Sequence, residues 1–413
     1  MNSQIDKRIL IAGAGLAGLT TALALADRGF SVLIMEKALA LSEVGAGLQL
    51  APNATRLLER LGVMEDLLPQ AVSPDALYLM DGVKAQPLMR MELGARAAQR
   101  WQAPYITCHR ADLQAALLKA VRRQPLITLH LGANVLSHHV MADKVTIRVD
   151  LNDQITDYSG QLLLGCDGVW SAQRSNLAVA GQSAPDQNRA RFTNHIAWRT
   201  TLPVTQVPQN FLSSLKDNLS VSAWLGHGAH LIAYPIKNGE AYNFVAITDG
   251  EDIGTSWDLK GDSAALIRSF TGWSQAVTDV LKAAPQWTFW PMFQMPEPKM
   301  VIDKRFVLLG DASHAMTPFA AQGAAMAVED AASLAAHLSP EQTDHSSALA
   351  AFERQRLARI AKVARRGQLN RIAYHAGGPL ALGRNLLFKL RKPESFLHDL
   401  DWLYQYDAAD IKS

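Results

Sequence analysis

The sequence predicts an α/β (α+β) protein in which an antiparallel β-sheet is inserted into a parallel α/β domain and helices follow. Three observations carry this prediction. Residues 8–36 follow the order strand, glycine-rich turn, helix and strand. Residues 126–165 and 190–250 alternate between apolar and polar side chains, as strands do. Residues 323–337 and 347–371 are alanine-rich and have helical periodicity.

The composition fits a globular protein of more than one domain. The chain has 413 residues, with 48% hydrophobic and 19% charged side chains. The net charge of +2 gives no reason to expect nucleic acid or an anionic membrane surface as a partner. Two cysteines, Cys108 and Cys166, exclude a disulfide scaffold and any CxxC motif, so we expect no metal site and a reducing compartment.

One apolar run near the N-terminus has the length of a signal peptide or a short membrane span. Residues 9–26 carry no charge and follow Lys7 and Arg8. Three regularly spaced glycines interrupt the run, and a second strand-like run follows at residues 31–35. We therefore expect no membrane segment and a cytoplasmic protein.

The order of the elements predicts a discontinuous first domain. Asn238 and Gly239 stand between two alternating runs inside the inserted sheet, which predicts a tight hairpin. A sheet inserted into a parallel domain favours a substrate site at the seam between them. The expected segments are residues 1–72, 103–180 and 286–340 for the parallel domain, 73–102 and 181–285 for the sheet domain, and 341–413 for the C-terminal helices.

A GxGxxG motif follows the first strand and opens the first helix. Gly13 permits a tight turn, Gly15 lets the backbone approach a pyrophosphate, and Gly18 lets helix and strand pack closely. Leu16 and Ala17 lie in the first turn of the helix, whose free N–H groups and positive dipole face the phosphates. The motif therefore predicts a dinucleotide site.

The second strand ends in an acidic residue. Glu36 stands 23 residues after Gly13, where its carboxylate can accept hydrogen bonds from an adenosine ribose. A carboxylate there disfavours a 2′-phosphate, so NADP is not expected in this site. The motif alone does not distinguish FAD from NAD, and a glycine-rich turn in another α/β protein is the simpler alternative.

Two later strands end in acidic turns that favour FAD. The first turn carries Asp167, for which the alternative is the N-cap of a helix or a turn acid. The second carries Asp311, which can hold the ribityl hydroxyls of a flavin. It leads into a helix that begins at Gly323 and Ala324, and the N-terminus of this helix can stabilise negative charge on a reduced flavin.

Taken in order, these motifs resemble the flavoprotein aromatic hydroxylases, the family that includes p-hydroxybenzoate hydroxylase. The resemblance covers nearly the whole chain and is nearest to the salicylate, 3-hydroxybenzoate and 6-hydroxynicotinate hydroxylases. It implies a Rossmann-like FAD-binding domain with an inserted substrate-binding sheet. Further segments that resemble the family are residues 43–49, 52–54, 109–113, 197–199 and 401–404.

The resemblance implies tightly bound, non-covalent FAD, with NADH or NADPH as a transient co-substrate. Glu36 and Lys37 would meet the adenosine, and Val135 the adenine. Arg110 would contact the pyrophosphate and the ribityl chain. Asp167 would serve both FAD and the passing nicotinamide nucleotide. The residues expected along the isoalloxazine are Gly45, Ala46 and Gly47.

The chemistry that the resemblance implies is hydroxylation of a small aromatic ring. NAD(P)H would reduce FAD, and dioxygen would form a flavin hydroperoxide whose outer oxygen is attacked by an electron-rich ring carbon. A phenolate is a better nucleophile than a phenol, so a base is expected. His230 and Tyr234 are the predicted catalytic pair, because they lie four apart on a strand and the near relatives resemble this spacing. The alternative is a surface histidine and a packed core tyrosine.

Other residues have two interpretations each. His314 beside the second acidic turn is expected to be structural support. Arg199 can bind a substrate carboxylate or lie exposed on its strand, and Pro318 resembles p-hydroxybenzoate hydroxylase more than the near relatives. The basic residues within 354–371 are expected on the solvated face of a helix. The residues that wall an aromatic pocket, or form plain core, are Trp287, Phe289, Trp290 and Phe293.

The predicted substrate is a phenolic acid or an N-heteroaromatic compound. Alternatives on the same scaffold are epoxidation, N-oxidation and decarboxylative hydroxylation, and a non-catalytic flavin-binding protein is a third hypothesis. The choice of substrate and the choice between NADH and NADPH stay open at this point. By analogy with the family, the C-terminal helices are expected to form a homodimer surface.

Overall fold

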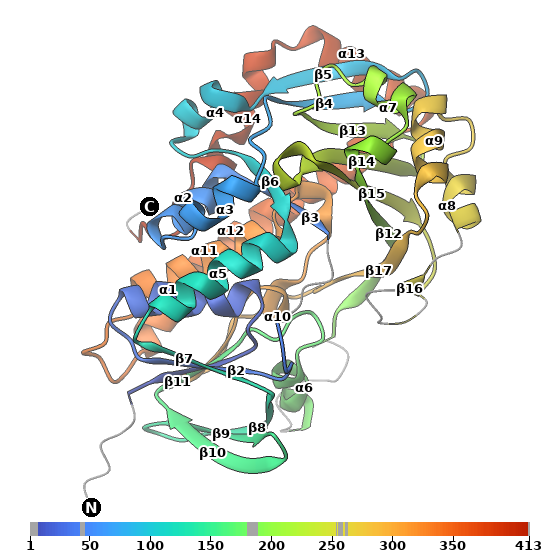
Figure 1. The fold of residues 1–413 in the computed structure, drawn as a ribbon. Helices are drawn as coiled ribbons and strands as arrows, with labels where there is room; N and C mark the ends of the chain where they lie inside the picture. Colours follow the sequence, from blue (N-terminus) through green and yellow to red (C-terminus); the bar gives the residue numbers. More distant parts are fainter. Residues whose placement is uncertain are drawn as a thin grey trace, which may run out of the picture.

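The computed structural model describes residues 7–41, 46–179, 189–252, 254, 259–260 and 263–411. Two sheets form separate layers, and long helices lie between and beside them (Figure 1). The first sheet, which is parallel except for the edge strand β18, has the order β18-β19-β11-β1-β2-β7. Its strands are β1 (Ile9–Ala12), β2 (Val32–Glu36), β7 (Ile127–Leu131), β11 (Leu162–Gly165), β18 (Val301–Asp303) and β19 (Phe306–Leu308).

Both faces of this parallel sheet are covered, which explains why its strands are almost continuously apolar. Ile9 and Ile11 of β1 pack in the core on the helical side, whereas Leu10 and Ala12 pack against the three-stranded sheet. The helices on the first side include α1 (Leu16–Asp27), α5 (Arg110–Arg123) and α11 (Gly323–His337). The three-stranded sheet consists of β8 (Ala133–Val140), β9 (Val145–Leu151) and β10 (Gln154–Gly160).

The second domain is an eight-stranded sheet with the order β16-β17-β12-β15-β14-β13-β4-β5. All its pairings are antiparallel except that of β13 with β4. The strands are β4 (Ala76–Asp81), β5 (Gln86–Glu92), β12 (Arg191–Pro203), β13 (Val221–Gly226), β14 (Ala229–Ile236), β15 (Ala241–Asp249), β16 (Leu259–Lys260) and β17 (Thr288–Gln294). Its outer face packs on α7 (Gln209–Ser214), α8 (Ser263–Ser269) and α9 (Gln275–Ala283).

The sheet continues past residue 285, where we expected the chain to return to the parallel domain. β17 pairs with β12, with Trp290 opposite Ala197. We therefore propose that the return begins after Gln294. The apolar and proline-rich sequence of this strand concealed its pairing, because alternation is the main signal for a strand.

The predicted hairpin is present between β14 and β15. Ile236 pairs with Ala241, and the turn between them is Lys237–Gly239. Asn238 has a φ of 53° and Gly239 one of 88°, a left-handed backbone that asparagine and glycine tolerate better than other residues.

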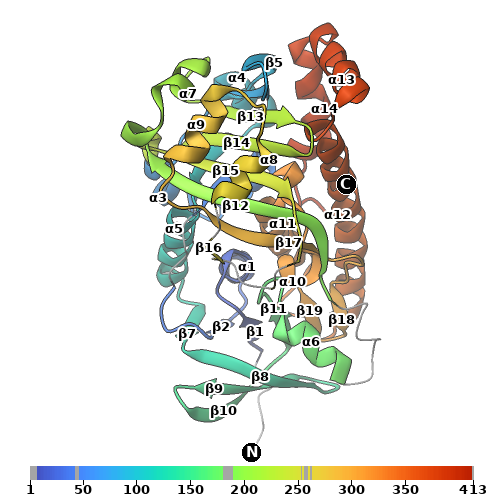
Figure 2. The same ribbon diagram turned by 90° about the vertical axis from the view of Figure 1, so that its right-hand side faces the viewer.

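The C-terminal helices are α12 (Ser346–Tyr374), α13 (Gly378–Leu390) and α14 (Pro393–Tyr404). α12 runs along one side of the molecule, from the parallel domain to the second sheet (Figure 2). Within the described ranges, no helix is long and apolar enough to cross a membrane. The other elements used below are β3 (Gly47–Leu50), α2 (Pro52–Arg60), β6 (Ile106–His109), α6 (Ala172–Val179), α10 (Asp311–His314) and the short 3-10 helix Pro318–Ala320.

Candidate active site

The GxGxxG segment has the shape of a phosphate cradle. Gly13 has a φ of +105°, and a Cβ there would lie 2.5 Å from the carbonyl oxygen of Cys166. A Cβ on Gly18 would lie 1.9 Å from the carbonyl oxygen of Gly13, so α1 can approach β1 only with glycine at this position. At Gly15 nothing lies within 4 Å of the Cβ position. The first turn of α1, with Leu16 and Ala17, is therefore open to an anion beside Gly15.

Glu36 is fixed beside this turn by backbone donors. Its Oε2 accepts from the N–H of Ala14 at 2.7 Å and its Oε1 from that of Ala38 at 2.9 Å. Lys37 is exposed next to it. The side chain of Val135 is buried in the core under the three-stranded sheet, so any contact of Val135 with an adenine would fall to its backbone.

Asp167 makes a hydrogen bond at the start of α6 and has one carboxylate oxygen without a partner among the described residues. Its Oδ2 accepts from the backbone N–H of Gln173 at 3.1 Å, near the start of α6. Its Oδ1 is buried and has no hydrogen-bond partner among the described residues. A buried, unpaired carboxylate oxygen costs free energy, which a hydroxyl of a bound cofactor would recover.

Asp311 is exposed at the start of α10, on a turn that a buried carboxylate holds in place. Oδ2 of Asp330 accepts from the N–H of Gly310 at 2.9 Å and lies 2.6 Å from Nε2 of His314. His314 is buried, and its pairing with Asp330 fits the supporting role expected for it. A carboxylate on a fixed turn can hold the hydroxyls of a ribityl chain.

Arg356 and Arg359 of α12 contradict the expectation of a solvated helix face. Arg356 is fully buried, with Nε 2.9 Å from Oδ1 of Asp330 and Nη1 2.7 Å from Oε2 of Glu329. Arg359 Nη2 lies 2.8 Å from Oε1 of Glu329. Burial alone would raise the pKa of Glu329, but the two arginines outweigh it and hold that pKa below its ordinary value. These three ion pairs join α11 to α12 beneath the turn that carries Asp311.

The N-terminus of α11 is open at Gly323, where nothing lies within 4 Å of the Cβ position. Ala324 follows in the first turn, so free N–H groups and the helix dipole are available to an anion.

Gly47 lies opposite the inserted sheet, and its N–H donates to Oδ1 of Asn243 at 2.8 Å. Ala46 is buried, and its carbonyl accepts from the N–H of Arg110 at 2.9 Å. The expected flavin residue Gly45 lies outside the described residues.

His230 and Tyr234 lie on the same face of β14, as their spacing predicts. This face packs toward the parallel domain, whereas Leu231 and Ala233 pack on the outer helices. His230 is 1% exposed and Tyr234 is 2% exposed, so the alternative of a surface histidine is wrong. A Cβ on Gly47 would lie 2.6 Å from Cε2 of Tyr234, which shows how closely the two domains meet there.

The strand register puts Arg199, two strands away from β14, in the cross-strand row between those of His230 and Tyr234. Tyr234 is paired with Asn243, and two positions further along β14, Ile232 is paired with Val245, which is paired with Arg199. The guanidinium carbon of Arg199 lies 3.3 Å from the ring centroid of Trp290. Arg199 is thus a stacked, half-buried side chain on the inner face.

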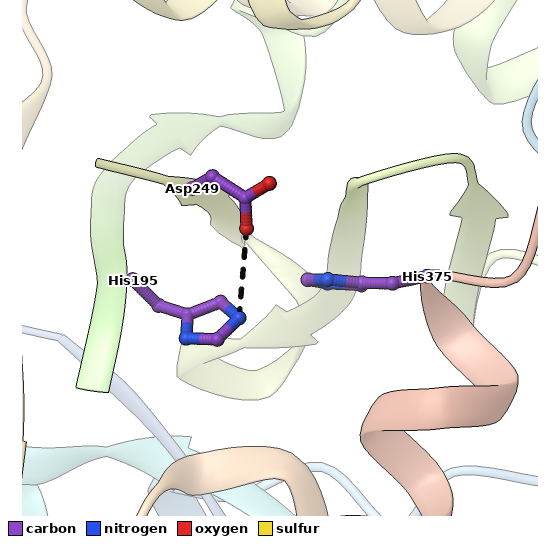
Figure 3. Close-up of side chains that lie close together, drawn as sticks. All are labelled: His195, Asp249 and His375. Carbon is purple, nitrogen blue, oxygen red and sulfur yellow. Dashed lines mark ion pairs between the residues drawn. The ribbon is translucent and has the colours of Figure 1, made fainter.

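His195, Asp249 and His375 lie close together (Figure 3), and His375 joins this group to His230. Nδ1 of His230 lies 2.8 Å from Nε2 of His375, the residue that ends α12. His195 on β12 lies beside the exposed Asp249, with Nε2 3.6 Å from Oδ1. Potential metal-ligand atoms of His195, Asp249 and His375 all lie within 4.8 Å of one another. The sequence prediction missed this cluster, although His195 shares its strand parity with Arg199.

Burial controls the protonation of this site. Burial, with nearby His375 and His195, holds the pKa of His230 well below its ordinary value. Burial, with His195, Arg371 and His227, lowers the pKa of His375 to about 4. Burial raises the pKa of the Tyr234 phenol. At neutral pH both histidines are therefore uncharged, and Tyr234 is a hydroxyl donor and not a base.

A cavity of about 150 Å³ lies at the seam of the two domains. Its walls include Trp170, Trp290, Phe293, Asp311 and Pro318. Two of the four aromatic residues predicted as pocket wall or core belong to the core, because Trp287 is fully buried there and Phe289 stacks on Trp198. Only Trp290 and Phe293 of that set line this cavity.

The fold and the site define a dinucleotide-binding protein whose donors suit FAD. The open glycine turn suits a pyrophosphate, the unpaired Oδ1 of Asp167 and the fixed Asp311 suit hydroxyls, and the N-terminus of α11 suits an anionic ring. Residues 6–367 match a family described as FAD binding domain.

Curated proteins and solved structures agree with this assignment. The chain is 34% identical over 407 residues to 3-hydroxybenzoate 6-hydroxylase 1 of Aquipseudomonas alcaligenes, covering 98% of this chain and 99% of that protein. It is 32% identical over 372 residues to 6-hydroxynicotinate 3-monooxygenase of Bordetella bronchiseptica, covering 87% and 90%. The fold matches a salicylate hydroxylase substrate complex with a TM-score of 0.82 at 22% identity, over 100% of this chain and 99% of that chain.

The chain belongs to the FAD-binding family of flavin-dependent aromatic hydroxylases. It is an FAD-dependent monooxygenase, as the sequence motifs predict. The predicted fold class, a Rossmann-like FAD-binding domain with an inserted antiparallel sheet and C-terminal helices, is confirmed.

Proposed function

We propose that this enzyme hydroxylates a small phenolic acid, or an N-heteroaromatic acid of similar shape, with dioxygen and NAD(P)H. The observation that carries the proposal is the placement of His230, Arg199 and Tyr234 on one inner face of the sheet, opposite the elements that suit FAD. When bound, FAD supplies the reduction and oxygen-transfer chemistry. The chain supplies binding, orientation, exclusion of water and control of one proton.

His230 is the proposed base for the substrate hydroxyl. It is neutral because its buried site disfavours the imidazolium, so it has a lone pair to accept a proton. Hydrogen bonding of the phenol to this lone pair raises electron density on the ring, which favours attack on an electrophilic oxygen. Tyr234, which stays protonated, is proposed to orient the substrate by donating its hydroxyl hydrogen.

Arg199 is the proposed anchor for the substrate carboxylate. Its stacking on Trp290 fixes the guanidinium plane, and its row on the sheet lies between those of His230 and Tyr234. A fixed guanidinium favours a planar carboxylate with two parallel hydrogen bonds. Relatives named for 3-hydroxybenzoate and 6-hydroxynicotinate support this substrate class, because both names describe a ring that carries a hydroxyl and a carboxylate.

A direct test follows NADH and NADPH oxidation by the purified holoenzyme while aromatic acids are added in turn. The panel is salicylate, 3-hydroxybenzoate, 4-hydroxybenzoate and 6-hydroxynicotinate, with mass spectrometry of the products. We expect one of them to stimulate oxidation and to gain one oxygen atom. Loss of carbon dioxide with that gain would identify decarboxylative hydroxylation. Bound FAD without stimulation by any of the four acids would refute the proposed substrate class.

We also propose a homodimer formed through the C-terminal helices. Five leucines of α13 are more than half exposed, and Leu369 and Ile372 at the end of α12 are exposed as well. So many exposed large apolar side chains on one helix are unusual on a monomer. Light scattering should give twice the mass of 45.0 kDa, and Leu382→Glu with Leu386→Glu should give the monomer with FAD retained. A monomer at all concentrations would contradict this proposal. The exposed leucines of α13 are Leu380, Leu382, Leu386, Leu387 and Leu390.

A further inference from the structure

Three histidines from separate parts of the chain meet where the sheet and α12 converge. His230 comes from β14, His195 from β12, and His375 ends α12. His230 is buried, His375 is half-buried, and Asp249 beside them is 76% exposed. The cluster therefore forms a graded series of ionisable groups from the interior to solvent.

We propose that His230 exchanges its proton with solvent through His375 and the exposed carboxylate of Asp249. This inference rests on the proposed role of His230 as the base for a phenolic substrate. It goes further by assigning a function to the end of α12, which lies outside both the FAD-binding and the substrate-binding segments. His375 acts through His230 and is a positioning and relay residue.

The hydrogen bond between the two imidazoles sets the direction of transfer. For His230 to accept a proton at Nε2, its Nδ1 must carry hydrogen and donate to the unprotonated Nε2 of His375, 2.8 Å away. When the O–H bond of the phenol breaks, its proton goes to Nε2 of His230. The Nδ1–H bond of His230 then breaks, and that proton goes to Nε2 of His375. His375 releases its own Nδ1 proton to water, so one proton leaves the site in total.

The surroundings of His230 disfavour a lasting positive charge on its ring, so they favour passing the proton on. Phe319 and Tyr374 pack on its ring, with centroids 5.5 and 5.2 Å away, so a charge on His230 would be poorly solvated. Burial keeps the pKa of His230 well below its ordinary value, which agrees with a group that passes a proton on. The cationic Arg371, with His195 and His227, also disfavours a lasting charge on His375.

Asp249 offers the exit from His375. Its carboxylate attracts a proton, and one polar atom from each of His195, Asp249 and His375 lies within 4.8 Å of the other two, a span that one water molecule can bridge. Nδ1 of His195 lies 2.6 Å from the carbonyl oxygen of Thr193, which can only accept, so Nδ1 carries the hydrogen. Nε2 of His195 therefore turns a lone pair toward Asp249, ready to accept a hydrogen from a bridging water.

The same path resets the site at the end of the reaction. After the first transfer, both imidazoles carry hydrogen on Nε2. When the hydroxylated ring regains aromaticity, its original oxygen needs a proton, and His230 returns one from Nε2. A proton from solvent then moves back through His375 to Nδ1 of His230. One proton leaves and one returns in each turnover, so no other co-reactant is required.

The test compares His375→Gln with the unaltered holoenzyme in weakly buffered solution, using the panel acid that the unaltered enzyme hydroxylates. Glutamine can still hydrogen-bond to His230, but its amide does not relay protons. We expect unchanged FAD content and flavin reduction, with product formed per NADH falling by about tenfold or more. Added imidazole should restore product formation in this variant only. Asp249→Asn should have a smaller effect, and His139→Gln, on the distant three-stranded sheet, should have none.

The outcomes separate this inference from the proposed function. Hydroxylation that is unchanged in His375→Gln, or lowered but not restored by imidazole, would overturn the relay and leave the proposed function intact. Failure of the unaltered enzyme with every panel acid would overturn the proposed function.

A second measurement needs no substrate. Nitrogen-15 NMR of histidine-labelled holoenzyme should show exchange of the His230 Nδ1 hydrogen with solvent that slows in His375→Gln. Equal exchange rates in the two proteins would also overturn the relay.

Discussion

Nδ1 of His230 lies 2.8 Å from Nε2 of His375, so a buried residue of the inserted sheet is hydrogen-bonded to the residue that caps the C-terminus of α12. This contact joins two segments that are far apart in the sequence. It also connects the proposed base to a half-buried group near solvent. A buried base that acts repeatedly must lose the proton it gains, and this hydrogen bond supplies a physical route.

His230→Ala should leave FAD bound and the flavin reducible, because His230 lies on the sheet and not among the residues that suit FAD. Hydroxylation should slow by about 10²- to 10⁴-fold, the usual contribution of a general base. Single-turnover mixing of reduced enzyme with dioxygen and substrate measures this step apart from reduction. An unchanged rate of hydroxylation with a phenolic substrate would show that His230 is not the base.

Substitution of Arg199 by methionine should weaken binding of a substrate carboxylate while keeping a similar side-chain length. Loss of a charged hydrogen-bonding partner costs about 1.5–3 kcal/mol, so the Kd of a phenolic acid should rise roughly 10- to 100-fold. The Kd of the matching phenol without a carboxylate should change little. Arg199→Lys is the control for charge, since lysine keeps the charge but not the paired hydrogen bonds. A uniform loss of affinity for both ligands would instead indicate a packing defect.

Acid should destabilise the folded protein through His230 and His375. Both have pKa values below 6.5 in the folded state, and that of His375 is about 4, whereas the unfolded chain binds protons at the ordinary value. Their contribution to stability is therefore complete above about pH 6.5 and is lost as the pH falls toward the folded pKa. The Tm at saturating FAD should fall between pH 7 and pH 5, and it should fall less in His375→Gln. An equal fall in both proteins would assign the acid sensitivity to other groups.

The sequence predicted the turn, strand end and helix that are proposed to hold the cofactor, because their signals are local. The glycine turn, Glu36 and the helix from Gly323 to His337 all follow from short-range patterns. His195 and His375 could not be paired with His230 in this way, because only the tertiary fold brings α12 to the sheet. The prediction that Arg356 lies on a solvated helix face was wrong for a related reason. The sequence of a basic helix does not show that its acidic partners lie on α11.

Arg356→Met should be far more damaging than loss of a surface ion pair. It would leave the buried carboxylates of Glu329 and Asp330 short of a partner, and breaking a buried pair costs about 3–5 kcal/mol of unfolding free energy. FAD affinity should fall as well, because Asp330 holds the turn that carries Asp311.

The matched control for that change is Arg148→Met. Arg148 and Asp157 form an exposed pair on the three-stranded sheet, and its loss should leave the free energy of unfolding nearly unchanged. Denaturant unfolding of both variants measures the contrast. Equal costs would mean that the network around Arg356 adds nothing beyond a surface contact.

Alanine at Gly15 and alanine at Gly18 should have different consequences within one motif. The Cβ of Gly18→Ala would meet the carbonyl oxygen of Gly13 at 1.9 Å, and a backbone atom cannot move aside without separating α1 from β1. This variant should fail to fold or should be severely destabilised. The Cβ of Gly15→Ala meets nothing within 4 Å, so the variant without FAD should keep its stability. Because this open space is where the pyrophosphate is expected, FAD affinity should nevertheless fall in Gly15→Ala. Thermal unfolding without FAD and FAD titration by flavin fluorescence separate the two effects, and full FAD affinity in Gly15→Ala would place the pyrophosphate elsewhere.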